Sequence, residues 1–282
     1  MGAECVKKLP RTGVTSGLQR SEGLSVDLLR LLGLGLAAGL AGAVNAVAGG
    51  GTLITFPSLL AAGLSAKAAN MTSTVAIWPG TVGGSLAYRS ELSDRLPRLK
   101  RLSLPSIAGA LVGALLLRAS SERVFDSVVP FLIIFASLVL AANSRLSRLA
   151  VRHGLASEHE SHMPAGMYVV MFLVGVYGGY FGAGIGILML AAISILAPDD
   201  IQHSNAVKGL LALLINFTAV VVFAVSGQVE WVPAGVMAVG AILGGYAGVS
   251  VARRINANVL RGMIVAWGLI TGLWLLRPLL GL

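Results

Sequence analysis

Two glycine clusters are the residues of this chain whose type and spacing could do chemistry. Ala48-Gly49-Gly50-Gly51 recurs 135 positions later, from 48 to 183, as Ala183-Gly184-Ile185-Gly186. Glycine lets an oxyanion approach the backbone closely, and a half-helix that follows a break presents free N–H groups and a partial positive charge. Paired interruptions at matching positions of two halves are typical of transport sites in membrane proteins. The clusters therefore predict an anion site.

Polar residues flank both clusters in the same register. The segment 70–73 corresponds to 205–208, so that Asn70 aligns with Asn205 and Ser73 with Lys208. Lys208 is a cation inside an apolar run without an acidic neighbour in sequence, which makes it the candidate counter-charge for an anion. The predicted substrate-binding residues are Asn45, Gly49, Gly50, Gly51, Thr52, Asn70, Thr72, Ser73, Gly182, Gly184, Gly186, Asn205 and Lys208.

Structural alternatives stay open for each of these residues. Asn70 and Asn205 could cap the helices that follow the breaks, and Asn45 could hydrogen-bond between helices. Lys208 could extend its ammonium group to the membrane surface, and the glycines could serve close helix packing.

The positions of the acidic residues exclude several classes of protein. All Asp and Glu residues lie in tails, in loops or at the edges of apolar runs. Their absence from the membrane interior argues against a proton pump with buried acids, an intramembrane aspartyl protease and a cation transporter. His159 and His162 are three residues apart in a polar segment, which we interpret as a solvated linker and not as a metal site. We expect no catalytic residue, cofactor or metal.

The composition predicts an all-α polytopic membrane protein in a lipid bilayer. Of the 282 residues, 56% are hydrophobic and 12% are charged, against about 25% charged in soluble domains. The net charge of +9 comes mainly from loops, so membrane topology explains it and no nucleic-acid partner is expected. About eight spans are predicted, at 28–49, 69–88, 102–118, 124–143, 166–183, 205–226, 232–251 and 257–277.

The predicted organisation is a polar tail (1–27), a first membrane repeat (28–143), a polar central loop (144–165) and a second membrane repeat (166–282). Each four-helix repeat begins with a glycine-broken segment. If each broken segment makes one net crossing, the basic tail, the 89–101 loop and the central loop share one side. If each folds back as a re-entrant hairpin, this bias disappears. The positive-inside rule favours the first topology, with parallel repeats and cytoplasmic termini.

Two further glycine motifs predict close contacts between helices. Gly109-x-x-x-Gly113 lies in the first half, and Gly240, Gly244 and Gly248 are spaced four apart in the second half. Small residues at this spacing let two helix backbones approach each other in a membrane.

The run from Gly39 to Pro57, the segment 70–74 and the run from Gly178 to Gly186 resemble the sulfite exporter TauE/SafE family, also called the sulfonate uptake permeases. The resemblance covers nearly everything after residue 30. It implies a multi-pass plasma (inner) membrane carrier of small anions such as sulfite or organosulfonates. Val207-Lys208 departs from the pair Thr72-Ser73 of the first half.

These observations predict a secondary transporter that works by alternating access between the two repeats, and not an enzyme. His203, at a span edge, could couple transport to protons, because histidine changes charge near neutral pH. One alternative is a passive anion channel. A less favoured alternative is a membrane-embedded hydrolase with Lys208 as base for Ser73 or Ser85.

Overall fold

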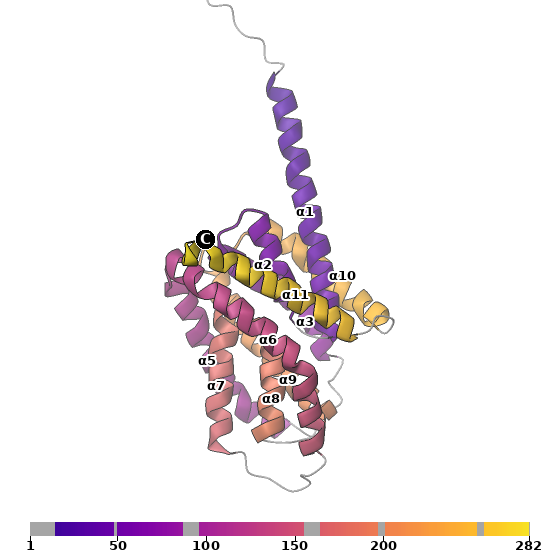
Figure 1. The fold of residues 1–282 in the computed structure, drawn as a ribbon, viewed down its shortest axis with the longest axis vertical. Helices are drawn as coiled ribbons and strands as arrows, with labels where there is room; N and C mark the ends of the chain where they lie inside the picture. The colour runs from indigo at the N-terminus through magenta and orange to yellow at the C-terminus, as the bar shows by residue number, and fades with distance from the viewer. Residues whose placement is uncertain are drawn as a thin grey trace, which may run out of the picture.

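The computed structural model describes residues 15–47, 50–86, 96–154, 164–196, 201–252 and 257–281. Within these ranges all regular elements are helices, which confirms the all-α prediction (Figure 1). They are α1 (Thr15–Val47), α2 (Thr52–Ala61), α3 (Ala66–Leu86), α5 (Leu96–Ala119), α6 (Glu122–Gly154), α7 (Ala165–Tyr180), α8 (Ile185–Leu196), α9 (Ile201–Ala224), α10 (Trp231–Ala252), α11 (Ala257–Leu276) and the 3₁₀ helix η2 (Arg277–Leu280).

Each of the eight expected spans coincides with a helix. Among the described residues, five helical stretches are long and apolar enough to cross a membrane: Asp27–Asn45, Leu96–Ala119, Glu122–Ala142, His203–Ala224 and Val259–Leu280. Two helices extend beyond the predicted boundaries. α1 already begins at Thr15 in the polar tail, and α6 continues to Gly154 in the segment predicted as central loop.

Both predicted helix breaks are present. α1 ends at Val47 and α2 begins at Thr52, while α7 ends at Tyr180 and α8 begins at Ile185. The backbone turns through left-handed conformations at Gly50 (φ 90°), Gly182 (φ 82°) and Gly184 (φ 75°), which glycine adopts without steric cost. The predicted site residue Gly49 lies outside the described residues.

At each break the chain reverses direction. The Gly51 N–H donates to Asn45 Oδ1 at 2.8 Å, and a Cβ at Gly51 would lie 2.7 Å from the Ala41 carbonyl oxygen. A Cβ at Gly178 would likewise lie 3.2 Å from Cγ2 of Ile185. A straight helix would separate these residues by about 1.5 Å per position, so the contacts require a turn. Both broken segments are therefore re-entrant hairpins, and the single crossing favoured by loop charge is wrong.

The start of α3 lies beside the ends of α5 and α7. Lys67 Nζ donates to the Arg118 carbonyl oxygen at 2.9 Å, and Asn70 Nδ2 donates to the Tyr180 carbonyl oxygen at 3.0 Å. α3 therefore runs opposite to α5 and α7. Because α2 reverses α1 and α3 reverses α2, α1 runs with α3 and opposite to α7.

The two halves are consequently inverted relative to each other, and the expected parallel arrangement is wrong. In Figure 1, α1 enters the helical body from the top, whereas α7 begins at the bottom. The basic residues at the start of α5, Lys100 and Arg101, lie at the opposite end of the bundle from Arg30 on α1. Loop charge does not indicate this topology, because each broken segment passes in and back and does not cross once.

The helices of the two halves are interwoven. The most extensive helix contact is between α1 and α10, and the next is between α5 and α7. Exchanging α1 with α7, α3 with α9 and α5 with α10 maps the α1–α10 contact onto α5–α7 and the α3–α10 contact onto α5–α9. Every large helix–helix contact thus joins the first half to the second.

The predicted glycine contacts between helices are confirmed where the structure describes them. A Cβ at Gly109 or Gly113 would collide with a carbonyl oxygen of α7, and a Cβ at Gly240 or Gly244 would collide with a carbonyl oxygen of α1. Gly109 faces the oxygen of Phe172 and Gly113 that of Val176, while Gly240 faces the oxygen of Gly35 and Gly244 that of Gly39. The helix backbones touch at these points, which explains why no larger residue occupies them.

Candidate functional site

The first glycine turn is closed by side chains from its own hairpin. Asn45 accepts the Gly51 N–H, so one of the free N–H groups at the start of α2 is already bonded. Thr52, the first residue of α2, is half-buried beside this turn. The structure therefore brings Asn45, Gly50, Gly51 and Thr52 together, as the sequence predicts.

Two buried hydroxyl groups connect this turn to α3. Thr55 Oγ1 and Ser73 Oγ lie 2.6 Å apart, and Thr55 Oγ1 also donates to the Gly51 carbonyl oxygen at 3.3 Å. Thr55 is not among the site residues predicted from the sequence. Its signal was its position four residues after Gly51, which places it on the same face of α2.

The second glycine turn lies beside Lys208. The Lys208 stem runs along Gly186, where a Cβ would be 3.7 Å from Cδ of the lysine. Lys208 Nζ donates to Asn205 Oδ1 at 2.9 Å, one helical turn nearer the start of α9. The ammonium group thus points toward the start of α9, and the aligned pair Asn205 and Lys208 forms one unit with the second glycine cluster.

Tyr177 holds the second turn, Asn216 lies near it, and neither was predicted as a site residue. Tyr177 Oη donates to the Ala183 carbonyl oxygen at 2.7 Å, and a Cβ at Gly182 would lie 3.7 Å from Asn216 Oδ1. A tyrosine six residues before a glycine turn carries no recognisable sequence signal, because its hydrogen bond depends on the chain reversal.

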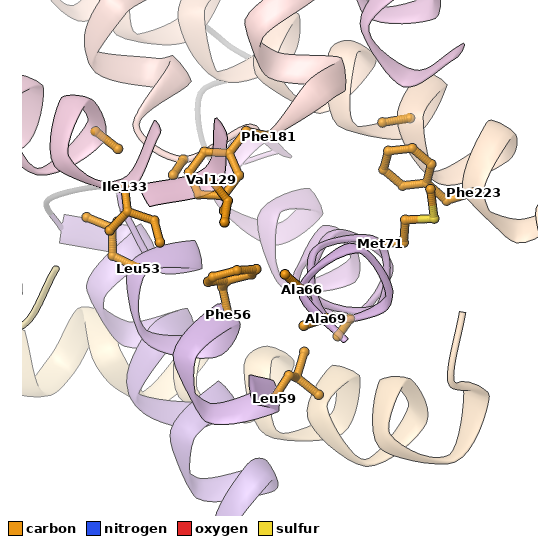
Figure 2. Packing of buried hydrophobic residues seen from close by; sticks show 14 of the residues in the cluster. Leu53, Phe56, Leu59, Ala66, Ala69, Met71, Val129, Ile133, Phe181 and Phe223 are labelled. Carbon is orange, nitrogen blue, oxygen red and sulfur yellow. The ribbon is translucent and has the colours of Figure 1, made fainter. Parts of the chain in front are cut away.

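Both glycine turns lie against one stretch of α6. A Cβ at Gly50 would be 3.2 Å from the Leu140 side chain, and a Cβ at Gly184 would be 3.8 Å from the Ala136 carbonyl oxygen. Figure 2 shows that Phe56 of α2 and Phe181 of the second turn lie in the same apolar cluster as Ile133 of α6, and the two aromatic rings meet edge to face at 5.8 Å. The two hairpins therefore share one wall.

The polar groups of Asn70 and Thr72 bond to other parts of the chain and not to the glycine turns. Asn70 Nδ2 bonds the end of α7, while its fully buried Oδ1 has no partner. Thr72 Oγ1 accepts the Glu230 N–H at 3.0 Å, before α10 begins. Asn70 is not a helix cap, because Ser65 Oγ accepts the Ala68 N–H at the start of α3. Asn205, four residues after Ile201, also lies inside its helix.

The site residues form two separate groups. α3 and α9 are antiparallel, since Trp78 Nε1 donates to the Leu213 carbonyl oxygen and Ser226 Oγ donates to Met71 Sδ. Ser73 therefore lies toward the end of α9, whereas Lys208 lies near its start. This separation counts against a hydrolase that pairs Lys208 with Ser73. The side chain of Ser85 is outside the described part.

One buried cation outside both groups has a structural role. Lys67 is 4% exposed, and its Nζ donates to the Ser120 carbonyl oxygen at 2.7 Å as well as to Arg118. It satisfies free carbonyl groups at the end of α5, where a positive charge is favourable. The described residues hold no cluster of three His, Cys, Asp or Glu side chains that could bind a metal.

Comparisons with known proteins find relatives that are named as membrane transporters. The chain is 28% identical over 243 residues to a "Probable membrane transporter protein" of Haemophilus influenzae, a match that covers 86% of this chain and 92% of the relative. It is 28% identical to the "Probable membrane transporter protein YfcA" of Escherichia coli K12, with 80% and 82% covered. It is 24% identical to the "Probable membrane transporter protein YunE" of Bacillus subtilis 168, with 82% and 90% covered.

No solved structure matches the chain significantly. The family model described as sulfite exporter TauE/SafE matches residues 34–275, which includes both hairpins and both site groups. This multi-pass membrane protein belongs to the sulfite exporter TauE/SafE family.

Proposed function

We propose that the chain is a secondary carrier of small anions in the plasma (inner) membrane, with sulfite and organosulfonates as its substrate class. The proposed mechanism is alternating access, and a proton is the proposed coupling partner, with His203 on the first turn of α9 as its candidate acceptor.

The surroundings of Lys208 carry the proposal. Its helix is long and apolar enough to cross the membrane, and the ammonium group has the neutral Asn205 as its hydrogen-bond partner. No carboxylate in the described part of the chain pairs with it. A cation in a medium of low dielectric constant, without a counter-charge, is stabilised when an anion binds.

The glycine turns support the same sign of charge. The start of α8 follows a turn with two left-handed glycines, Gly182 and Gly184, beside the Lys208 stem. The free N–H groups at a helix start and a nearby ammonium group both favour an oxyanion. The family description and the relatives' names favour transport, with sulfite as the first substrate to test.

Flux measurements on purified protein in liposomes test the proposal. Lys208→Met keeps the apolar stem and removes the charge, so we expect uptake of labelled sulfite to fall by on the order of tenfold or more, which corresponds to about 1.4 kcal/mol per tenfold. Lys100→Met, at an exposed lysine of α5, is the matched control and leaves flux unchanged. Full flux in Lys208→Met contradicts the role of Lys208.

Counterflow separates a carrier from a passive channel. A carrier preloaded with unlabelled sulfite takes up labelled sulfite faster, because loaded binding sites return more quickly than empty ones. Absence of this stimulation favours the channel. Stimulation of uptake by an imposed pH gradient, lost in His203→Asn, is the expected sign of proton coupling.

A further inference from the structure

We propose that the parts of this carrier that move against each other are not its two sequence halves. They are a central unit, formed by α5 to α9, and an outer unit, formed by α1 to α3 together with α10 and α11. The proposal rests on the proposed function, because it assigns the moving parts of that carrier.

The three largest helix contacts lie inside these two units. α10 packs extensively on α1 and α3 within the outer unit, and α5 packs extensively on α7 and α9 within the central unit. Each of these contacts joins one sequence half to the other. A motion of half against half would therefore have to open the most extensive interfaces of the molecule.

The contacts inside the units are made backbone to backbone. A Cβ at Gly244 of α10 would collide with the Gly39 carbonyl oxygen of α1, and a Cβ at Gly80 of α3 would lie 3.0 Å from the Ala241 carbonyl oxygen of α10. In the central unit a Cβ at Gly179 would collide with the Ala110 carbonyl oxygen. Such contacts contain no side chain that could change rotamer, so the helices cannot slide without clashes.

Taken together, the contacts between the units are smaller than those inside them, although α6 with α11 is as extensive as α5 with α9. Side chains make them. The units meet where α3 packs on α9 and where α6 packs on α11, with a minor contact of α3 with α6. The side chains of Lys67 and Asn70 also bond α3 to the ends of α5 and α7. The Trp78 ring lies 5.3 Å from the Phe217 ring, and its Nε1 donates to the Leu213 carbonyl oxygen at 3.3 Å. On the other seam a Cβ at Gly272 would meet the Ile134 side chain at 2.7 Å. Side chains can repack, so these seams can open and close.

Each unit carries one complete site group, and the larger hydrophobic cluster contains residues of both units. One hydrophobic cluster consists of residues of the central unit, among them Leu102, Met171, Met189 and Leu211. Asn45, Gly51, Thr55 and Ser73 all belong to the outer unit, and Gly186, Asn205 and Lys208 all belong to the central unit. The two site groups therefore lie on different units, one on each side of the boundary that opens.

Disulfide cross-links distinguish units from halves. In a Cys5→Ser background, Gly80→Cys with Ala241→Cys joins the halves within the outer unit, where the Cβ atoms would be 3.3 Å apart. Ser137→Cys with Gly268→Cys joins the halves across the units, with Cβ atoms 3.4 Å apart. Both separations are close to those of natural disulfides.

We expect the protein with the first oxidised pair to keep its sulfite flux. In the protein with the second oxidised pair, the flux should fall by on the order of tenfold or more. Reduction with dithiothreitol restores the second. Loss of flux in both oxidised pairs, or in neither, overturns the assignment of the units. Absence of flux in the reduced proteins and in the Cys5→Ser parent contradicts the proposed function instead.

Single-molecule fluorescence transfer tests the units without any substrate. Dyes on Leu28→Cys and Leu280→Cys report within the outer unit, and dyes on Glu122→Cys and Leu280→Cys report across the units; all three residues are exposed. In liposomes we expect one transfer efficiency for the first pair and two interconverting efficiencies for the second. Two efficiencies for the first pair, or one for both pairs, overturns the proposal whatever the substrate is.

Discussion

Lys208 Nζ lies 2.9 Å from Asn205 Oδ1, so the cation of α9 is held by a neutral carbonyl group one helical turn away. At the aligned position of the first half, Ser73 Oγ lies 2.6 Å from Thr55 Oγ1. One site group therefore offers an ammonium group and the other offers hydroxyl groups. An anion would therefore meet different chemistry at each group, although the two groups occupy equivalent places in the fold.

Placing a carboxylate beside Lys208 is expected to weaken anion binding. Asn205→Asp gives the ammonium group a fixed counter-charge, so a substrate anion no longer gains its full attraction. Asn205→Ala removes the carbonyl and leaves the charge available. Sulfite binding to purified protein, measured by calorimetry, should fall in the first variant and persist in the second. Equal affinities in both variants would contradict the idea that Lys208 attracts the substrate by its charge.

The hydroxyl pair of Thr55 and Ser73 is expected to stabilise the first hairpin. A cycle of Thr55→Val, Ser73→Ala and the double variant should give a coupling of about 0.5–1.5 kcal/mol, the usual net contribution of a hydrogen bond. Thermal unfolding in detergent measures it. Strictly additive effects would mean that the two hydroxyl groups do not stabilise each other.

The contact of α10 with α1 is expected to tolerate no added methyl group at Gly244. Gly244→Ala places a Cβ against the Gly39 carbonyl oxygen and should lower stability by about 1–3 kcal/mol, as overpacking does. Gly235→Ala on the same helix is the matched control, because a Cβ there meets no atom within 4 Å. The yield of folded protein in size-exclusion chromatography should drop for the first variant alone.

Removal of the Lys67 charge is expected to loosen the junction of α3 and α5. Lys67→Met leaves the carbonyl groups of Arg118 and Ser120 without their donor, which costs about 1–3 kcal/mol for each buried group left unsatisfied. The melting temperature should fall, whereas Lys100→Met at an exposed site should not change it. A structural role predicts that flux per folded molecule stays close to that of the parent.

Much of the local structure was predictable from residue types. The glycine breaks before α2 and α8 followed from clusters that no long helix could easily contain, and the close contacts at Gly109 and Gly244 followed from their four-residue spacing. Neither feature depends on distant parts of the chain. The partners of Asn70 and Thr72 were not predictable, because Tyr180 and Glu230 are more than 100 positions away.

The sequence by itself determined that this is an all-helical membrane protein with two broken segments and a cation, Lys208, next to the second. Hydropathy and glycine spacing are local properties, so they can be read from the sequence without knowledge of the fold. Only the tertiary structure decided the direction of each half and the interweaving of their helices. A short apolar helix such as α2 can complete a crossing or fold back, and both options bury similar apolar surface. The choice depends on packing against α1, α3 and α6, which hydropathy and loop charge do not encode.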